Sequence, residues 1–172
     1  MDERTLTIML RLIHIVSGIF WVGTIFLIAG FLMPTARSVG PESGRFMQHM
    51  ILQRRLPVFL GIAMLLTVLS GFTMYARMTA ATHGAWAGTA PGIGYGVGGL
   101  AAILGAVAGG AISGPAARRM AAIGQQGAAS GGLSAEQQAE MKRLQGRATL
   151  GSRATAGLLA MAAGAMAVAR YL

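Results

Sequence analysis

The sequence predicts an all-α, polytopic membrane protein whose transmembrane part is a four-helix bundle. Of its 172 residues, 54% are hydrophobic and only 11% are charged, which is far from the balance of soluble domains. Uncharged stretches alternate with basic segments, and two of these segments, 37–55 and 118–153, contain ten of the 14 Lys and Arg residues. Short basic loops of this kind orient membrane helices.

The first uncharged stretch, 12–33, predicts a span over about 8–34. Its 22 residues match a hydrocarbon core of roughly 30 Å at about 1.5 Å per residue. In the loop that follows, Pro41 is well placed to begin a short helix. Apolar residues share one face of that helix, as in a helix that lies in the membrane interface: Phe46, Met47, Met50 and Ile51.

The second span is expected over 56–77 and the third over 91–117. Glycines four residues apart fill the third span. In water each would cost about 1 kcal/mol relative to alanine, but in lipid small residues let neighbouring helices approach closely. The pairs are Gly94 and Gly98, Gly105 and Gly109, and Gly110 and Gly114.

A flexible Gly/Ser/Gln-rich linker is expected over 124–132. Ser134 and Gln137 then form a capping box for a short solvated helix. The fourth span, about 150–171, has an uncharged core of only 16 residues, 154–169. The prediction is a single transmembrane domain, 1–172, with short interfacial helices in loops one and three.

The distribution of charge predicts the orientation. Loops one and three carry the basic clusters and should be cytoplasmic, whereas the loop between spans two and three has Arg77 as its one basic residue. Both termini then lie outside, on the periplasmic face of a bacterial inner membrane. The net charge of +9 flanks apolar runs, so we expect the lipid bilayer and no nucleic acid as partner. A homo-oligomer or a larger membrane complex stays open.

His14 is the leading candidate for a functional residue. At 3.6 residues per turn, it shares one stripe of span one with Gly18 and Trp21. An ionisable group within a membrane helix normally turns toward a partner or cofactor, and the gap left by Gly18 suits a flat macrocycle with Trp21 as its wall. In the alternative interpretation, His14 is structural and bonds to another helix's backbone or to Thr67 or Ser70.

His83 lies on the same predicted side of the membrane as His14. Together they would supply two axial ligands to a b-type haem, unless His83 is simply a solvated loop residue. Arg54 and Arg55, at the start of span two, suit a propionate or a lipid phosphate, although membrane orientation explains them equally well. His49 lies on the opposite, cytoplasmic side and most simply occupies a polar helix face.

Metal and hydrolytic chemistry receive weaker signals. The chain has no Cys and 12 Met, and Met with His would suit copper, but the methionines on the side of His14 form no dense motif. Gap-filling in packed positions is the alternative. No carboxylate lies within a span, which disfavours a proton-coupled carboxylate transporter or a paired-carboxylate enzyme. Whether the protein is an enzyme stays open.

Two motifs resemble a bacterial membrane superfamily. These are Leu-Ile-His-Ile-Val-Ser-Gly-Ile-Phe-Trp-Val-Gly over 12–23 and Arg-Arg-Leu-Pro over 54–57, and 112–119 resembles the end of helix three in uncharacterised members. The superfamily includes flavin-independent membrane protoporphyrinogen oxidases and copper-resistance D proteins. The resemblance implies a haem- or porphyrin-binding role for His14. Those oxidases also need a lysine in a later span, whereas Lys142 lies in loop three, so the chain is nearest to the uncharacterised members.

The expected function is therefore binding of a b-type haem or porphyrin beside His14, for tetrapyrrole handling or membrane electron transfer. One alternative is a non-catalytic accessory subunit without a cofactor, whose glycine-rich face docks a larger partner. Copper handling is the third possibility.

Overall fold

All regular structure in this chain is helical. The computed structural model describes residues 2–40 and 42–172, and no strand occurs in those ranges. Short π-helical segments join several α-helices without a break. In chain order the elements are α1 (Glu3–Leu27), η1 (Ile28–Leu32), α2 (Met33–Val39), α3 (Glu42–Gln48), η2 (His49–Gln53), α4 (Leu56–Ala81), η3 (Ala85–Gly88), α5 (Ala90–Ala108), η4 (Gly109–Ser113), α6 (Gly114–Ser130) and α7 (Ala135–Ala169).

Four continuous helical rods in the described residues are long and apolar enough to cross a membrane. Between 11% and 28% of the residues in their most apolar windows are buried inside the protein, so apolar side chains cover the outer surface, as contact with lipid requires. The predicted all-α helical bundle is confirmed, and the rods fit a multi-pass membrane protein. The rods are Glu3–Val39, Leu56–Ala81, Ala90–Ser130 and Ala135–Ala169.

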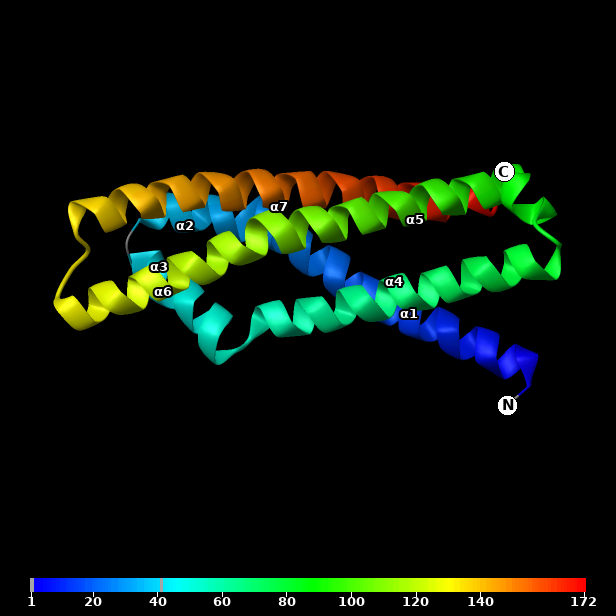
Figure 1. Cartoon of the computed structure of the whole chain (residues 1–172), viewed down its shortest axis with the longest axis horizontal. Helices are drawn as coiled ribbons and strands as arrows, with labels where there is room; N and C mark the ends of the chain where they lie inside the picture. Colours follow the sequence, from blue (N-terminus) through cyan, green and yellow to red (C-terminus); the bar gives the residue numbers. More distant parts are fainter. Residues whose placement is uncertain (1, 41) are drawn as a thin grey trace.

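The rods alternate in direction, so both termini lie at one end of the molecule. Figure 1 shows the N-terminus, the C-terminus and the turn with η3 at the right-hand end, and the turn between α6 and α7 at the left-hand end. The fold therefore has the predicted arrangement, with the termini at one end and loops one and three at the other.

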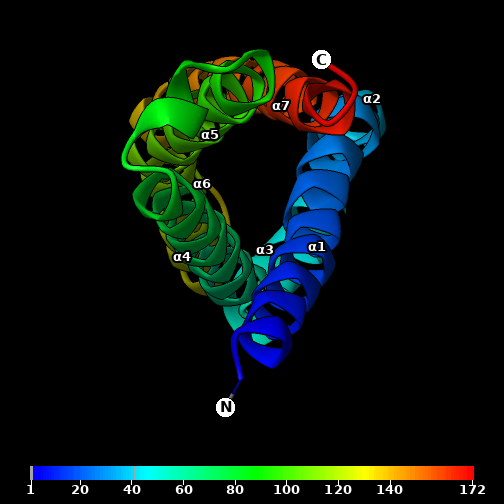
Figure 2. The same cartoon turned by 90° about the vertical axis from the view of Figure 1, so that its right-hand side faces the viewer.

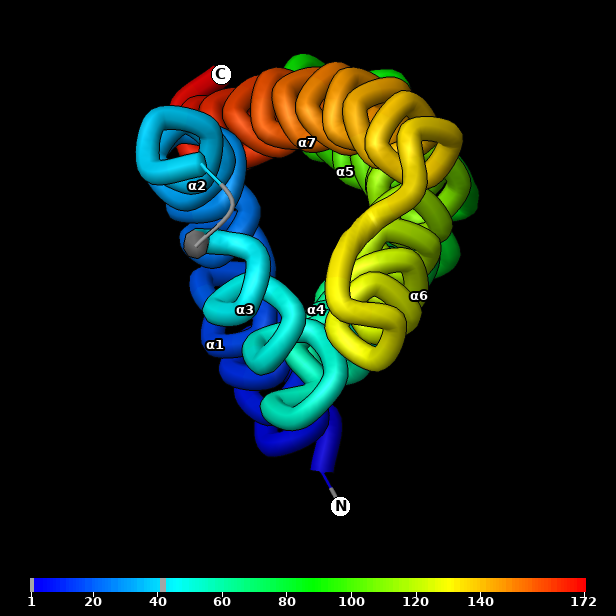
Figure 3. The backbone as a smooth tube through the Cα atoms, turned by 90° about the vertical axis from the view of Figure 1, so that its left-hand side faces the viewer, coloured from blue at the N-terminus to red at the C-terminus, as the bar shows by residue number. Residues whose placement is uncertain are grey.

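Seen along the long axis, the rods form a ring of two closely packed pairs (Figures 2 and 3). In one pair α1 packs against α4, and in the other α5 packs against α7, with fewer contacts between the pairs. Trp21 of α1 lies where the two pairs meet and is only 3% exposed. Its cluster contains the buried residues Ala63, Ala101, Ala102, Leu159 and Ala162.

Glycine lets α5 and α7 approach closely, as predicted. A Cβ atom at Gly98 would lie 2.8 Å from Cγ of Met166 and 3.1 Å from the carbonyl oxygen of Ala162. Gly110 has open space around it and Gly114 meets only its own rod, so this third predicted pair does not contact another helix. The glycines that do face α7 are Gly94, Gly98, Gly105 and Gly109.

Loop three differs from the prediction. The predicted linker at 124–132 is mostly helix, because α6 continues to Ser130, and the turn occupies only the residues between α6 and α7. Gly131, at φ 76°, ends α6 in the left-handed conformation that glycine adopts readily. The predicted short helix of this loop is the first part of α7, which the Ser134 capping box starts as expected.

A second hydrophobic core explains why the loop-three helices are long. Ile123 of α6 and Leu144 of α7 are 1% and 6% exposed, and they cluster with Ala116, Ala148 and neighbouring methionines. Each rod therefore continues past the basic residues at the membrane boundary as a packed α6–α7 hairpin. Arg119 of α6 donates to Glu140 of α7 in this hairpin.

Loop one contains the short helix that was predicted, formed by α3 and η2. Phe46 on its apolar side is 60% exposed, as expected for a side chain that enters lipid. Pro41, the predicted first residue of this helix, lies outside the described residues.

Candidate functional site

Small and polar side chains meet where α1 and α4 pack together. His14 and Ser17 lie one turn apart on α1, and Thr67 and Ser70 lie one turn apart on α4, so each pair shares a helix face. Ser17, Thr67 and Ser70 are buried and His14 is half-buried. We call these four residues, together with Gly71, the His14 cluster.

The histidine ring is held by the backbone of the facing helix. Nδ1 of His14 lies 2.8 Å from the carbonyl oxygen of Thr67, and because a carbonyl only accepts, Nδ1 carries the proton of this bond. The hydroxyl of Ser70 lies 3.4 Å from the same nitrogen. In the tautomer that carries its proton on Nδ1, the lone pair is on Nε2.

Nε2 of His14 is unpaired among the described residues and is not fully buried. It has no hydrogen bond to another described residue, and within the described ranges the one buried side-chain nitrogen or oxygen without a partner is Oγ1 of Thr79. Nε2 therefore keeps access to the protein surface. An imidazole that donates one N–H to a backbone carbonyl and presents the other nitrogen is the usual arrangement of a metal-ligating histidine.

Two hydroxyls bond across the crossing beside the ring. Oγ of Ser17 and Oγ1 of Thr67 are 2.8 Å apart, and each also lies 2.6–2.8 Å from a carbonyl of its own helix, that of Ile13 or of Ala63. Each hydroxyl has one hydrogen, so one of them donates across the crossing and the other donates to its own backbone. This bond fixes the register of α1 on α4.

One glycine of α4 permits the close approach, and a second glycine, on α1, lies against Thr67. A Cβ atom at Gly71 would lie 2.7 Å from Cε1 of His14, so the ring rests on this glycine. At Gly18 the nearest neighbour is Cγ2 of Thr67, 3.5 Å from an added Cβ atom. Thr67 therefore occupies the gap that Gly18 was expected to leave for a macrocycle.

Trp21 does not line an open slot next to His14. Its ring lies in the core with Ala63 and the small residues of α5 and α7, where it fills the junction between the two helix pairs. The predicted stripe of His14, Gly18 and Trp21 does face inward, but in this structure Gly18 and Trp21 have packing roles.

His83 is not brought next to His14. It is exposed, adopts φ 51°, and follows the last turn of α4. The helix from Gly71 to Ala81 is continuous, and its ten residue steps place the two histidines at least ~15 Å apart along the axis. The structure therefore does not bring the two histidine side chains together.

Arg54 and Arg55 also lie far from the His14 cluster. Both are exposed, and Arg55 is the N-cap of α4, twelve residues or ~18 Å before Thr67. They stand at the basic end of the molecule, whereas His14 lies nearer the end with the termini.

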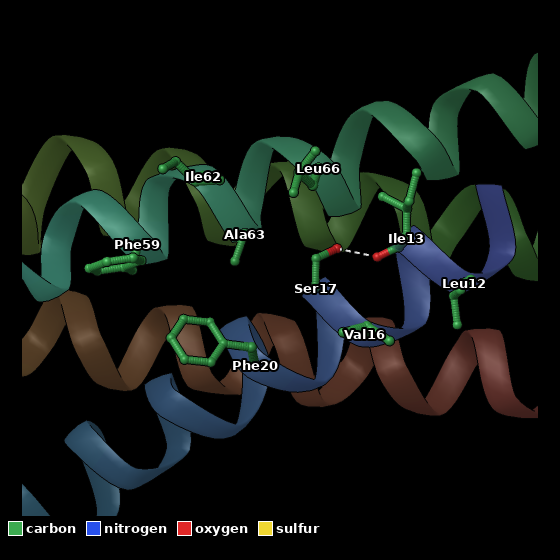
Figure 4. Close-up of a pocket in the computed structure, with 9 residues that line it drawn as sticks. All are labelled: Leu12, Ile13, Val16, Ser17, Phe20, Phe59, Ile62, Ala63 and Leu66. Atoms are coloured by element: carbon green, nitrogen blue, oxygen red, sulfur yellow. Dashed lines mark hydrogen bonds between the residues drawn. The ribbon is translucent and has the colours of Figure 1, made fainter. Parts of the chain in front are cut away.

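An apolar groove lies between α1 and α4 beside the cluster (Figure 4). Its volume is about 610 Å³, and Ser17 supplies the one hydroxyl among the described lining residues. His14 is not part of the lining, and Val16 is 59% exposed, so the groove belongs to the lipid-facing surface. The lining comprises Leu12, Ile13, Val16, Ser17, Phe20, Phe59, Ile62, Ala63 and Leu66.

The copper prediction receives no support from clustered His or carboxylate side chains. In the part of the chain that the structure describes, no three His, Asp or Glu side chains come together. Met64 packs beside the core of Trp21, which is a gap-filling position.

Thr67 and Ser70 were expected as alternative partners of His14, whereas Gly71 was not. The helical spacing of Ala63, Thr67, Ser70 and Gly71 marks a face of small residues and is the signal that was available.

No family model, no curated protein and no solved structure matches this chain.

Proposed function

We propose that this integral membrane protein binds one b-type haem or related porphyrin through Nε2 of His14. The observation that carries the proposal is the bond from Nδ1 to the carbonyl of Thr67, which leaves an accessible lone pair on Nε2. His83 has no part in this version, because the structure does not place it next to His14. Arg54 and Arg55 are left to membrane orientation.

Thr67 and Gly71 prepare the ring for this role. The Thr67 carbonyl fixes the tautomer and the ring plane, and it raises the basicity of Nε2. Gly71 leaves room for the ring against α4, and apolar neighbours keep water scarce. A bound haem would supply one-electron chemistry, which fits membrane electron transfer or tetrapyrrole handling. Membership of the superfamily suggested by residues 12–23 is part of the same proposal.

The visible spectrum of detergent-purified protein, expressed with haem precursor or reconstituted with hemin, tests this. We expect a Soret band that His14→Ala abolishes and that His83→Ala and His49→Ala, the matched histidine controls, retain. His14→Ala must keep the helical circular dichroism of the parent. A parent protein that stays colourless after reconstitution contradicts the proposal, and so does a Soret band that survives His14→Ala.

A non-catalytic accessory subunit is the second candidate. It is favoured by the mutual bonding of His14, Ser17 and Thr67 and by the filling of the Gly18 gap, because the crossing is then complete without a cofactor. α7 of the same chain covers Gly94, Gly98, Gly105 and Gly109, so a partner that docks on this rod would use its open glycines, such as Gly99. If the protein is such a subunit, we expect it to stay colourless after reconstitution with hemin. His14→Ala should then lower only its thermal stability.

A further inference from the structure

A second pocket, of about 260 Å³, lies between loop one and α6 at the basic end of the molecule. One face of α3 and η2 contributes most of it, because its residues recur at the i, i+3, i+4 and i+7 spacing of a helix face. Gln125 of α6 completes it from the other side. The lining consists of Arg45, Gln48, His49, Leu52, Gln53 and Gln125.

The chemistry of this pocket suits an anion. Arg45 brings a guanidinium, the three glutamines bring amide N–H groups, and His49 adds a ring N–H. None of these five polar side chains has a hydrogen bond to another described residue, and no carboxylate occurs among the described lining residues. Several unused donors therefore converge with nothing to oppose a negative charge.

The pocket lies at the outer edge of the headgroup layer, within the reach of a lipid phosphate. Gln53 lies three residues before Leu56, where α4 enters its uncharged stretch, and Gln125 lies seven residues, or ~10 Å, beyond Arg118. Headgroup layers extend roughly 5–8 Å beyond each side of the hydrocarbon core. The apolar side of the same short helix, with Phe46 exposed, faces the acyl region next to it.

We propose that this pocket binds the phosphate of an anionic phospholipid, with Arg45 as its bidentate ligand and Gln125 as the donor from α6. Guanidinium pairs with phosphate in this manner. Binding of the headgroup would link loop one to the α6–α7 hairpin. The proposal is independent of any cofactor at His14, which lies near the other end of α4.

Native mass spectrometry of the detergent-purified full chain, titrated with phosphatidylglycerol, phosphatidylcholine or inorganic phosphate, tests the site. We expect Arg45→Gln to weaken binding of phosphatidylglycerol about tenfold, and Gln125→Ala to weaken it about threefold. Arg54→Gln, which removes the same charge at the same end but outside the pocket, is the matched control and should change binding less than about twofold. Phosphatidylcholine should bind more weakly than phosphatidylglycerol.

Equal losses for Arg45→Gln and Arg54→Gln would overturn the site, because they would indicate a diffuse charge effect. Inorganic phosphate that competes fully at millimolar concentration would overturn the lipid as the source of the phosphate. Should Arg45→Gln fail to fold, the losses of phosphatidylglycerol binding in Gln125→Ala and Arg54→Gln are compared. Equal losses in the two variants reject the proposal.

Discussion

His14 and Gly71 fit together across the α1–α4 crossing. A Cβ atom at position 71 would lie 2.7 Å from Cε1 and 3.0 Å from Nδ1 of His14, distances that side chains do not tolerate without moving. The ring therefore depends on glycine at this position for both its place and its bond to Thr67. The relationship is testable because α4 contains a second glycine, Gly61, with open space around it.

Gly71→Ala should destabilise the protein by about 1–3 kcal/mol, because the methyl group displaces the His14 ring. Gly61→Ala, the matched control on the same helix, should change stability by less than about 0.5 kcal/mol. Thermal or denaturant unfolding in detergent measures both. In a His14→Ala background the cost of Gly71→Ala should largely vanish, and full additivity of the two changes contradicts the contact.

Gly98 and Gly99 give a second matched pair, on α5. Gly98→Ala should cost about 1–3 kcal/mol, since its methyl group would meet Met166 and the Ala162 carbonyl of α7. The adjacent Gly99 has no neighbour within 4 Å, and Gly99→Ala should be close to neutral. The same unfolding measurement compares them, and equal effects would mean that α5 meets α7 through another face.

The four rods could be predicted from the sequence because lipid imposes a simple rule on composition. Their ends could not. Arg118 and Arg119 mark where α5 and its continuation leave the hydrocarbon, but they do not break a helix, and the chain stays helical to Ser130. The burial of Ile123 against Leu144 stabilises that extension, and such a contact between distant segments is not visible in a local pattern.

The inward face of α1 could be predicted from helical periodicity. Thr67 and Ser70 of the second span could also be predicted as partners of His14. The register between α1 and α4 could not, because it depends on which small residues of the two helices meet. That register brings Gly71 to the ring and fills the Gly18 gap with Thr67. His83 lies on the same end of the molecule as His14 but not beside it, since α4 runs to Ala81, four residues past its predicted end.

Trp21→Ala should be among the most damaging single changes, at about 3–5 kcal/mol. The ring is 3% exposed and packs where both helix pairs meet. Trp86→Ala is the control, because Trp86 is only half-buried, in a cluster with Tyr75 and Tyr95. Denaturant titration in detergent measures the loss of stability. It should be much larger for Trp21→Ala than for Trp86→Ala. The reverse order would contradict this core.

The α6–α7 hairpin should loosen in acid. Arg119 and Glu140 lie outside the uncharged spans. Hydrogen bonds from Arg119 hold the pKa of the Glu140 carboxyl below its usual value. A lowered pKa in the folded state means that the pair stabilises the hairpin at neutral pH, and that this contribution is lost as the pH falls through the pKa of the folded state. Amide hydrogen exchange over 119–130, corrected for intrinsic rates, should show the change. Glu140→Gln should remove this pH dependence and Glu136→Gln should keep it.

Cysteine labelling should establish the orientation of the bundle in the membrane, because the chain has no Cys of its own. We expect a cysteine at Gln126 or Ser130 to react with a membrane-impermeant maleimide only after the bacterial inner membrane is opened. Cysteines at Thr82 and Ala85, near the termini, should react as soon as the periplasm is accessible. The reason is the excess of Arg and Lys at the loop-one and loop-three end, which the positive-inside rule assigns to the cytoplasm. Labelling of Gln126→Cys from the periplasm would reverse the orientation, and it would place the pocket of Arg45 and Gln125 in the outer leaflet.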